Sequence, residues 1–520
     1  MINAVGRDIP DYLLKDGREV YQGKNYKDGE YFKKASPRVR KYEKPVENKL
    51  CASIREACEK CGAHDGMTFS FHTEFRDGDY VAAMVCRVLV EEMGLKDIHV
   101  AATSLGTAQD IFADYMEQGI IVEAQTSGVR GRIGEVISAG KLKNPAIIRS
   151  HGGRPRAVEA GEVHIDIAFL AASTSDCCGN AKGQGGKNNC GSMGFAMHDA
   201  HYADHTVIIP ATLVPFPNLP PSISCIDVDA VCVVDAIGDT KKIATKEARM
   251  TDNPRELMMA QNVANVIAAT PYFKDGFSFQ TGVGGPSLAV NRFLEEHMRE
   301  KNIKMSLALG GTSSAICALQ DKGLVEYILD TQDFDQGAAA HLFSNPHHIE
   351  IDLSEYANAS NKGAYVNKLD YVVLSALEID TKFNVNVITG SDGVLRGAPG
   401  GHPDTAAGSK CCIIVTPLVR GRMATVCKDV VTVTTPGDCV DVLVTDYGIA
   451  VNPLRQDIIE CLDKAGVKHV TIESLQEKAY SLVGEPDPLE WEDQVVAIVE
   501  ARDGTILDVV RKVKPFSFDN

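Results

Sequence analysis

DGFSFQTGVGGPSL, residues 275–288, is the segment from which the fold of this chain can be predicted most directly. Phe277 and Phe279 alternate with polar residues as in a short strand, and the apolar positions after Pro286 follow helical spacing. Proline is favoured in the first turn of a helix, because its missing N–H has no partner there. The segment therefore predicts a strand, a glycine loop and a helix. Such a loop can bind a phosphate through backbone N–H groups and the helix dipole, and a plain tight turn is the alternative.

A second copy of this pattern lies earlier in the chain. Residues 65–71, DGMTFSF, resemble the start of the segment above, and later pairs such as Leu105 and Leu309 are 204 positions apart. A register kept over about 150 residues predicts one α/β unit used twice. Where the second copy has its glycine loop, the first has EFRD at 74–77. A phosphate-rich ligand is therefore expected to bind mainly to one half.

Length and composition indicate a globular chain with more than one domain, because 520 residues exceed one ordinary core. We predict an α/β fold of two similar lobes from an internal duplication, each with a largely parallel sheet and covering helices. The expected parts are an N-terminal arm at 1–48, a first lobe at 49–240 and a second lobe at 241–520. The arm is basic and rich in tyrosine, so it either wraps another part of the assembly or is a solvated leader.

Charge and cysteine usage exclude several classes of protein. The net charge of −17 argues against nucleic acid or anionic lipid as a partner, and no apolar run is long enough for a membrane span. The first residues lack the apolar core of a secretory signal, and fifteen scattered cysteines suggest reduced thiols in the cytoplasm. Cys58-x-x-Cys61 has no second pair at zinc spacing, so we read two buried helix thiols there and expect no metal site.

One segment is strongly basic in this acidic chain. Residues 127–156 carry seven Lys or Arg side chains and a single acid, Glu135. Screening limits long-range repulsion to roughly 8 Å, so a local arginine group can hold a polyanion. Arginine suits carboxylates because its planar fork pairs with both oxygens. A solvated basic face is the alternative reading.

Two further segments carry candidate catalytic groups. Glu378 follows a buried-strand run, at a position where the first half has Thr174, so a carboxylate is present in one half alone. It is either an acid or base that orients substrate or a structural carboxylate. Gly400 and Gly401 free two backbone N–H groups that could stabilise an oxyanion, and a hinge between strands is the other reading.

Several of these motifs together resemble the CoA-transferase and acetyl-CoA hydrolase superfamily. They are the doubled unit, the glycine loop at 281–286, LEID at 377–380 and GGHPD at 400–404. Across nearly its whole length, the chain is similar to the alpha chains of bacterial citrate lyases. That similarity includes VYQGK at 20–24 in the arm and VTDYG at 444–448.

The resemblance implies an enzyme that exchanges acetate for citrate on a thiol. The thiol belongs to the CoA-like prosthetic group of a small acyl carrier, the gamma chain, and a separate beta chain cleaves the citryl thioester to oxaloacetate and acetyl thioester. We therefore expect no cofactor bound covalently to this chain, CoA or acetyl-CoA as a surrogate substrate, and a hetero-oligomer with beta and gamma chains. The candidates are Gly282, Val283, Gly284 and Gly285 for CoA or the carrier, Gly400 and Gly401 for the oxyanion, Arg130, Arg132, Arg149 and Arg154 for citrate, and His151 and Glu378 as further catalytic groups.

One position departs from the glutamate-dependent branch of the superfamily. There, the nucleophilic glutamate lies about thirteen residues before a glycine that resembles Gly323, and this chain has Gly310 at that place. Gly106, the counterpart in the first half, is also glycine. We therefore predict direct transfer in a ternary complex: a citrate carboxylate attacks the acetyl thioester, and the thiolate attacks the resulting mixed anhydride. Holding both reactants together can lower the barrier by several kcal/mol.

Other functions stay open from the sequence. An acetyl-CoA hydrolase would use the same loops with water as the acceptor, and a CoA-transferase could act on another carboxylic acid. A non-catalytic subunit would bind the carrier without exchanging acetate. A nucleotide-cofactor protein is the weakest reading, because Gly-x-Gly-Gly-Pro departs from the dinucleotide fingerprint.

Overall fold

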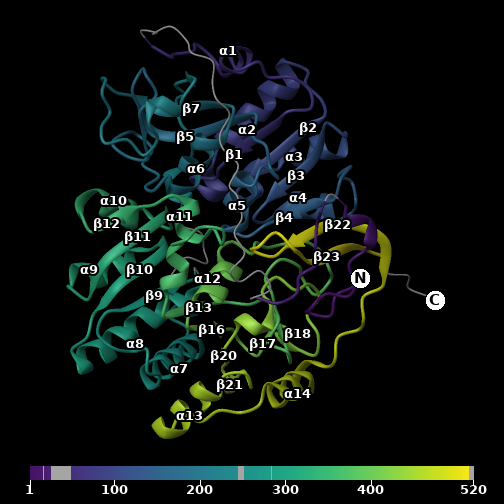
Figure 1. The fold of residues 1–520 in the computed structure, drawn as a ribbon, viewed down its shortest axis with the longest axis vertical. Helices are drawn as coiled ribbons and strands as arrows, with labels where there is room; N and C mark the ends of the chain where they lie inside the picture. The colour runs from purple at the N-terminus through teal and green to yellow at the C-terminus, as the bar shows by residue number, and fades with distance from the viewer. Residues whose placement is uncertain (16, 25–47, 244–250, 283, 515–520) are drawn as a thin grey trace.

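The computed structural model describes residues 1–15, 17–24, 48–243, 251–282 and 284–514. Two lobes lie one above the other, the first in purple to blue and the second in teal to green (Figure 1). A ten-stranded sheet forms the first lobe and an eight-stranded sheet the second. The predicted α/β class, with two lobes built on largely parallel sheets, is confirmed.

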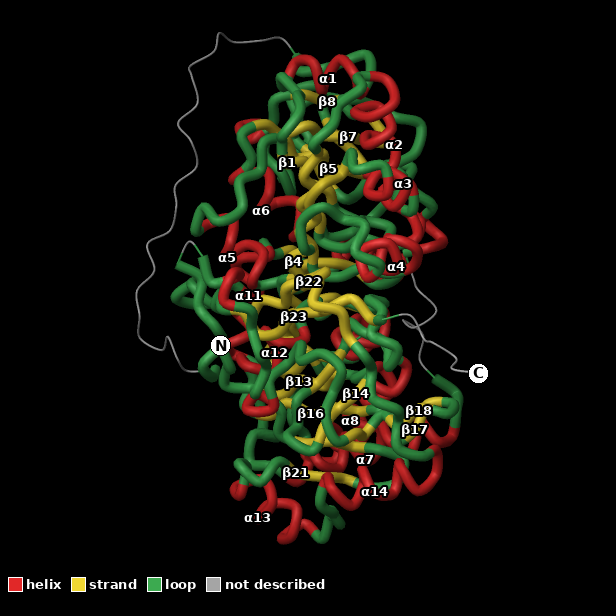
Figure 2. The backbone as a smooth tube through the Cα atoms, turned by 90° about the vertical axis from the view of Figure 1, so that its right-hand side faces the viewer, coloured by secondary structure: helices red, strands yellow, loops and turns green. Residues whose placement is uncertain are grey.

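The sheet of the first lobe has the order β23-β22-β4-β3-β2-β1-β5-β7-β8, and β6 pairs with β5. Helices cover both of its sides, with α5 and α6 on one side and α2, α3 and α4 on the other (Figure 2). Its strands within the lobe are β1 (Thr68–Phe71), β2 (Ile98–Ala102), β3 (Ile121–Thr126), β4 (Ala146–Ile148), β5 (Ile167–Ser175), β6 (Ala181–Lys182), β7 (His205–Leu213) and β8 (Ala230–Val231). Its helices are α1 (Ile54–Lys60), α2 (Val81–Arg87), α3 (Ile111–Glu117), α4 (Gly131–Ser138), α5 (Gly153–Glu159) and α6 (Gly194–Tyr202).

The sheet of the second lobe has the order β12-β11-β10-β9-β13-β16-β20-β21. Its strands are β9 (Phe277–Thr281), β10 (Met305–Thr312), β11 (Val325–Asp333), β12 (His348–Glu350), β13 (Tyr371–Leu374), β16 (Cys411–Val415), β20 (Val442–Val444) and β21 (Ile449–Val451). Its helices are α7 (Pro254–Ala269), α8 (Gly285–Lys301), α9 (Ser314–Asp321), α10 (Gln336–Ser344), α11 (Leu353–Ala357), α12 (His402–Gly408), α13 (Gln456–Ala465) and α14 (Ile472–Val483). Two small sheets, β14 (Glu378–Asp380) with β15 (Val385–Asn386) and β19 (Val426–Cys427), and β17 (Val419–Arg420) with β18 (Met423–Ala424), complete the lobe.

The central strand order is the same in both lobes. The order β4-β3-β2-β1-β5-β7-β8 in the first corresponds to β12-β11-β10-β9-β13-β16-β20 in the second. β3 and β11 begin at residues 121 and 325, and β5 and β13 at 167 and 371, so both pairs are 204 residues apart. The duplication predicted from the sequence register is confirmed. Because the strands are parallel, the loops after their carboxyl ends gather at one edge of each sheet, where α/β proteins bind ligands.

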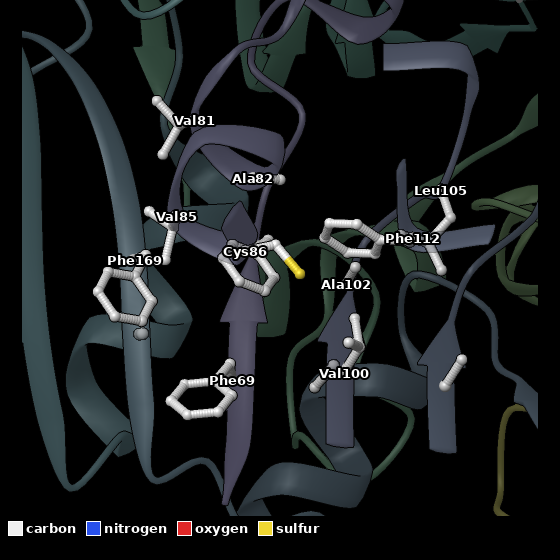
Figure 3. Packing of buried hydrophobic residues seen from close by; sticks show 14 of the residues in the cluster. Phe69, Val81, Ala82, Val85, Cys86, Val100, Ala102, Leu105, Phe112 and Phe169 are labelled. Carbon is white, nitrogen blue, oxygen red and sulfur yellow. The ribbon is translucent and has the colours of Figure 1, made fainter. Parts of the chain in front are cut away.

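Two phenylalanines pack together in the core of the first lobe, on the neighbouring strands β1 and β5. Phe69 on β1 and Phe169 on β5 lie 6.2 Å apart between ring centroids, and α2 covers them with Val81, Val85 and Cys86 (Figure 3). All of these side chains are buried. Within the described ranges, no helix combines the length and apolar character that crossing a bilayer requires.

The C-terminal hairpin lies between the lobes and is drawn in yellow in Figure 1. β22 (Trp491–Glu500) and β23 (Ile506–Val513) pair antiparallel. β22 also pairs parallel with β4, so the hairpin extends the sheet of the first lobe. The sequence predicts that all of 241–520 belongs to the second lobe, but this hairpin joins the sheet of the first. The boundary between the two lobes at residue 240 stays a prediction.

The described part of the N-terminal arm packs on that hairpin. Val20 forms a parallel bridge with Ile506, and Arg7 contacts Asp508 at 3.0 Å. A small core unites the two segments, consisting of Ile9, Val20, Val495, Ile498 and Ile506. These arm residues therefore wrap their own chain, while 25–47 of the predicted arm lie outside the described residues.

Candidate functional site

The glycine loop of the second lobe connects β9 to α8. The Gly282 N–H donates at 2.8 Å to a carbonyl of β13, and Gly284 is the N-cap of α8, with Pro286 in the first turn. A Cβ on Gly284 would lie 2.6 Å from the hydroxyl oxygen of Ser375, so glycine lets the loop pass close to the end of β13. The predicted strand, loop and helix are confirmed. Val283 lies outside the described residues.

The second glycine turn lies beside the first. His402, which begins α12, has Nε2 3.0 Å from the carbonyl oxygen of Ser375. Gly401 is the N-cap of α12 and passes close to Tyr356, so that a Cβ there would lie 2.5 Å from the tyrosine hydroxyl oxygen. Both turns therefore border Ser375, near the carboxyl end of β13. Their use in binding CoA and an oxyanion stays a prediction.

Turns of the first lobe face the second glycine turn. The His151 N–H donates to the Gly400 carbonyl at 2.8 Å, and the Gly400 N–H donates to the Ser127 carbonyl at 3.4 Å. The second of these bonds is long and therefore weak. Asp404 on α12 accepts two hydrogen bonds of 2.8 Å from the turn at 150–152. We call this contact the seam, and it consists of residues 127–128, 150–152 and 397–404.

His151 is the titratable group at the centre of the seam. Burial lowers its pKa to about 3, and the guanidinium groups of Arg76, Arg154 and Arg130 act in the same direction. The ring is therefore neutral near pH 7, and it packs edge-on against Phe195 with 4.7 Å between centroids. A neutral imidazole can still donate one N–H, while the arginines supply positive charge. The surroundings of His151 suit an anionic ligand.

Two of the four arginines predicted to bind citrate are buried in ion pairs. Arg149 contacts Glu500 with Nε at 2.6 Å and Nη2 at 3.1 Å. Arg154 donates from Nη2 to Asp199 at 2.7 Å. Both arginines are less than a tenth exposed. Removing one partner of such a buried ion pair would leave an uncompensated charge in the fold. A role of either arginine in citrate binding stays a prediction.

The other two arginines are exposed. Arg132 on α4 pairs with Asp114 and Glu117 of α3 at 2.6 and 2.8 Å. Arg130 is the N-cap of α4 and is close enough to His151 to lower its pKa. Of the four, Arg130 is the one that combines exposure with proximity to His151.

Sequence reasoning missed Arg76. Its φ of 52° lies in the left-handed region, which is rare outside glycine and is concentrated at functional sites. Its guanidinium lies 4.5 Å from the ring centroid of Phe334 in the opposite lobe, and its charge contributes to the low pKa of His151. The sequence did offer one signal for Arg76. It lies in residues 74–77, the segment of the first half that corresponds to the glycine loop of the second half.

Glu378 lies in the small sheet of the second lobe. Its Oε2 accepts from the Asn386 amide at 2.8 Å and from the Val431 N–H at 3.1 Å. Burial raises its pKa, and these hydrogen bonds oppose that shift. Of the two interpretations of Glu378, these contacts favour the structural carboxylate. A catalytic role of Glu378 stays a prediction.

Helix α6 carries a buried histidine, His198. Burial alone would lower its pKa, but the carboxylates of Asp199, Glu159 and Asp352 raise it to about 9. Because this value is above the ordinary 6.5, charged His198 stabilises the fold below about pH 6.5, and the contribution is lost as pH rises through about 9. We expect the urea midpoint of unfolding to fall across that window.

A His198→Gln variant should show a flatter dependence of the midpoint on pH between about 6.5 and 9. His64→Gln, at an exposed position where the ring contacts a backbone carbonyl, is the matched control and should keep the slope of the unaltered chain. Equal slopes in the His198→Gln variant and the unaltered chain would contradict the assignment.

Comparison with known proteins identifies close relatives. Residues 47–513 match the family model described as citrate lyase, alpha subunit (CitF). The citrate lyase alpha chain of Haemophilus influenzae is 51% identical over 468 residues, which cover 90% of this chain and 93% of that protein. The citrate lyase alpha chain of Klebsiella pneumoniae is 48% identical over 503 residues, 97% of each chain.

Solved structures agree with the sequence matches. A protein from Streptococcus mutans assigned as the alpha subunit of citrate lyase, solved in complex with citrate, superposes with a TM-score of 0.95 at 50% identity and covers 99% of this chain and 100% of its own. The alpha subunit of a malonate decarboxylase from Acinetobacter baumannii has a TM-score of 0.62 at 16% identity, over 84% of this chain and 88% of its own. The second likeness concerns the fold alone.

Proposed function

The chain belongs to the citrate lyase alpha subunit family, and from this premise we propose that it moves the thiol of an acyl carrier, or of CoA, from acetyl thioester to citrate. The products are citryl thioester and acetate. The observation that carries the proposal is the position of the second glycine turn, which borders the glycine loop through Ser375 and borders the positively charged surroundings of His151 directly.

The glycine loop is the proposed site for the CoA-like prosthetic group. Gly282, Gly284 and Gly285 lead into the N-terminus of α8, whose N–H groups and dipole favour a phosphate. At the equivalent place in the first lobe, Glu74 is buried and burial raises its pKa well above its usual range. The first lobe thus has a buried acid and no glycine loop at this place, which favours binding to the second lobe.

Citrate is proposed to lie beside His151, with Arg130 and Arg76 opposite its carboxylates. A guanidinium binds a carboxylate through two parallel hydrogen bonds, and the neutral His151 ring can donate a further N–H. The second glycine turn lies next to His151, so its backbone N–H groups are near the carbonyl that reacts. This placement brings the two substrates together, as a ternary complex requires.

Direct transfer through a mixed anhydride is the proposed route, without a glutamyl thioester. Gly310 stands where the glutamate-dependent relatives have their nucleophile, and it offers no carboxylate. Its φ is +100°, and a Cβ there would lie 2.3 Å from the amide nitrogen of Gln280. The left-handed backbone at this position therefore disfavours a glutamate, and the carboxylate itself is missing. A citrate carboxylate acts as the nucleophile instead.

The activity is tested by incubating the chain with acetyl-CoA, with and without citrate, and following acetate, free thiol and citryl-CoA. We expect citryl-CoA and acetate to form when citrate is present. Loss of acetyl-CoA to free thiol at the same rate without citrate would identify a hydrolase. Faster transfer to another carboxylic acid would identify a different CoA-transferase, and no exchange of labelled acetate into acetyl-CoA would identify a non-catalytic subunit.

Replacing Arg130 by glutamine should raise the KM for citrate about tenfold or more, because one charged hydrogen-bonding partner of a carboxylate is lost. The KM for acetyl-CoA should change little. Arg132→Gln is the matched control, since Arg132 already pairs with Asp114 and Glu117. An equal rise in both KM values, or the same effect from Arg132→Gln, would show that the citrate site is misplaced.

Glu378→Gln should retain transfer activity, because a glutamine oxygen can accept the two hydrogen bonds that Glu378 now accepts. The measurement is kcat for citryl-CoA formation, beside the unfolding midpoint. Complete loss of turnover in a variant that is as stable as the unaltered chain would restore Glu378 as a catalytic group.

The proposed assembly contains a beta chain that cleaves the citryl thioester and a gamma chain that carries the prosthetic group. No cofactor is proposed to be attached covalently to this chain, since the reacting thiol belongs to the carrier. Co-purification of the three chains from a common expression culture tests the assembly, and CoA serves as the carrier surrogate in assays of the isolated chain.

A further inference from the structure

Three side chains with metal-binding atoms converge at the outer edge of the second sheet. Cys317 comes from α9, His341 from α10 and His348 from the edge strand β12. The thiol sulfur and one nitrogen of each histidine lie within 4.8 Å of one another, and all three residues are buried. β12 is three strands away from β9, so this cluster is separate from the glycine loop and the seam.

Both histidines are oriented by carboxylates. Nε2 of His348 lies 3.2 Å from Oδ2 of Asp330, and Nε2 of His341 lies 3.3 Å from Oδ1 of Asp321, with the Asn345 amide also near that nitrogen at 3.4 Å. In a metal-bound arrangement each Nε2 carries the hydrogen and donates it to the carboxylate, because an ionised carboxylate can only accept. The two Nδ1 atoms then point their lone pairs at each other, 2.9 Å apart.

Two facing lone pairs at this distance repel unless a cation lies between or beside them. Without a cation, the His341 hydrogen lies on Nδ1 and bonds to His348, and Nε2 of His341 accepts from the Asn345 amide. A bound cation takes the place of that hydrogen between the rings, and the hydrogen moves to Nε2, where the Asp321 carboxylate accepts it. One sulfur and two imidazole nitrogens are a donor set that suits zinc. Zinc bonds of about 2.0–2.3 Å hold tetrahedral donors roughly 3.3–3.8 Å apart, so the two Nδ1 atoms need to separate only slightly. A histidine that donates its second N–H to a carboxylate is the usual arrangement around a metal.

We infer that Cys317, His341 and His348 bind a zinc-class divalent cation that joins α9, α10 and the edge strand β12. The ligands are 24 and 7 positions apart in the chain, and neither spacing matches a short zinc motif, which is why the sequence predicted no metal. The surrounding contacts reach the other lobe, because the Asp330 carbonyl accepts a hydrogen bond of 3.0 Å from the Ser192 hydroxyl. The ion would thus hold the edge of the second lobe where it meets the first.

The site is tested on the full chain, stripped with a chelator and then titrated with Co²⁺ alone. We expect about one bound cobalt per chain, with tetrahedral visible bands and a near-ultraviolet band from thiolate-to-cobalt charge transfer. Cys317→Ser should lose the thiolate band, and His341→Gln should weaken binding. Asp321→Asn, at a carboxylate that is 68% exposed, should lower the affinity about 10–100-fold without touching a ligand.

The control is His347→Gln, an exposed histidine next to His348 in the chain, which should bind cobalt like the unaltered chain. Zn²⁺ should raise the unfolding temperature of the unaltered chain and of His347→Gln, and should leave Cys317→Ser unchanged. The inference fails if the stripped chain binds no cobalt, if the thiolate band survives in Cys317→Ser, or if His347→Gln weakens binding as much as His341→Gln does.

Discussion

Replacing Arg154 by methionine should lower the free energy of unfolding by about 3–5 kcal/mol, the usual cost of removing one partner from a buried ion pair. Arg154 donates to Asp199, which is fully buried, from Nη2 at 2.7 Å. Without the guanidinium, the Asp199 charge loses its strongest partner inside the first lobe. The measurement is the urea midpoint and slope, compared with those of the unaltered chain.

Two variants make this prediction decisive. Adding Asp199→Asn to Arg154→Met should recover part of the lost stability, because a neutral amide needs no buried counter-charge. Arg132→Met, which breaks an exposed pair, should cost less than about 1 kcal/mol. If Arg154→Met is as stable as Arg132→Met and instead raises the KM for citrate, then Arg154 is a substrate ligand and the structural interpretation is wrong.

Replacing Gly401 by alanine should reduce kcat for transfer about 10²–10³-fold, the usual effect of losing one oxyanion donor. The new Cβ would lie 2.5 Å from the Tyr356 hydroxyl oxygen and 3.3 Å from its ring carbons. Tyr356 is buried and accepts a hydrogen bond of 2.9 Å from Gln280, so the tyrosine ring has little freedom to move. The backbone turn must shift instead, and its N–H groups with it.

Gly363→Ala is the matched control for Gly401→Ala. No atom lies within 4 Å of a Cβ added at Gly363, and its φ is compatible with alanine. Its kcat should equal that of the unaltered chain. A kcat for Gly401→Ala near that of Gly363→Ala would exclude the second glycine turn from the reaction, while a loss of folding in Gly401→Ala alone would make the turn structural.

The fold was largely predictable because its signals are local and occur twice. A strand, a glycine loop and a proline in the first helical turn follow one another at 277–286, and the 204-residue separation repeats the pattern. Sequence order alone could not place the C-terminal hairpin, because strand pairing between β22 and β4 depends on packing over 350 residues of chain. An isolated hairpin has no sequence feature that names its partner sheet.

Of the candidate site, only the glycine turns could be predicted from the sequence. Gly284 and Gly401 were identified because glycine turns are visible in the sequence, and in the structure both pass close to neighbouring side chains. Among the arginines, composition could not separate Arg130, which is exposed near His151, from Arg149, whose charge is matched by Glu500 across the fold. Arg76 was missed because its left-handed backbone and its contact with Phe334 arise from tertiary structure.

The central claim is that a citrate oxygen, and no enzyme carboxylate, takes up the acetyl group. In direct transfer, a citrate carboxylate oxygen attacks the acetyl carbonyl and the thiolate leaves. The thiolate then attacks the citryl carbonyl, and acetate departs with the oxygen that came from citrate. An enzyme glutamate would give its own oxygen to the first acetate instead.

A single turnover with enzyme in excess, using citrate labelled with oxygen-18 in its carboxylates and unlabelled acetyl-CoA, distinguishes the two routes by mass spectrometry of the acetate. Direct transfer predicts one labelled oxygen in the acetate of that first turnover. Unlabelled acetate in the first turnover would contradict it and would place a covalent enzyme thioester on the path.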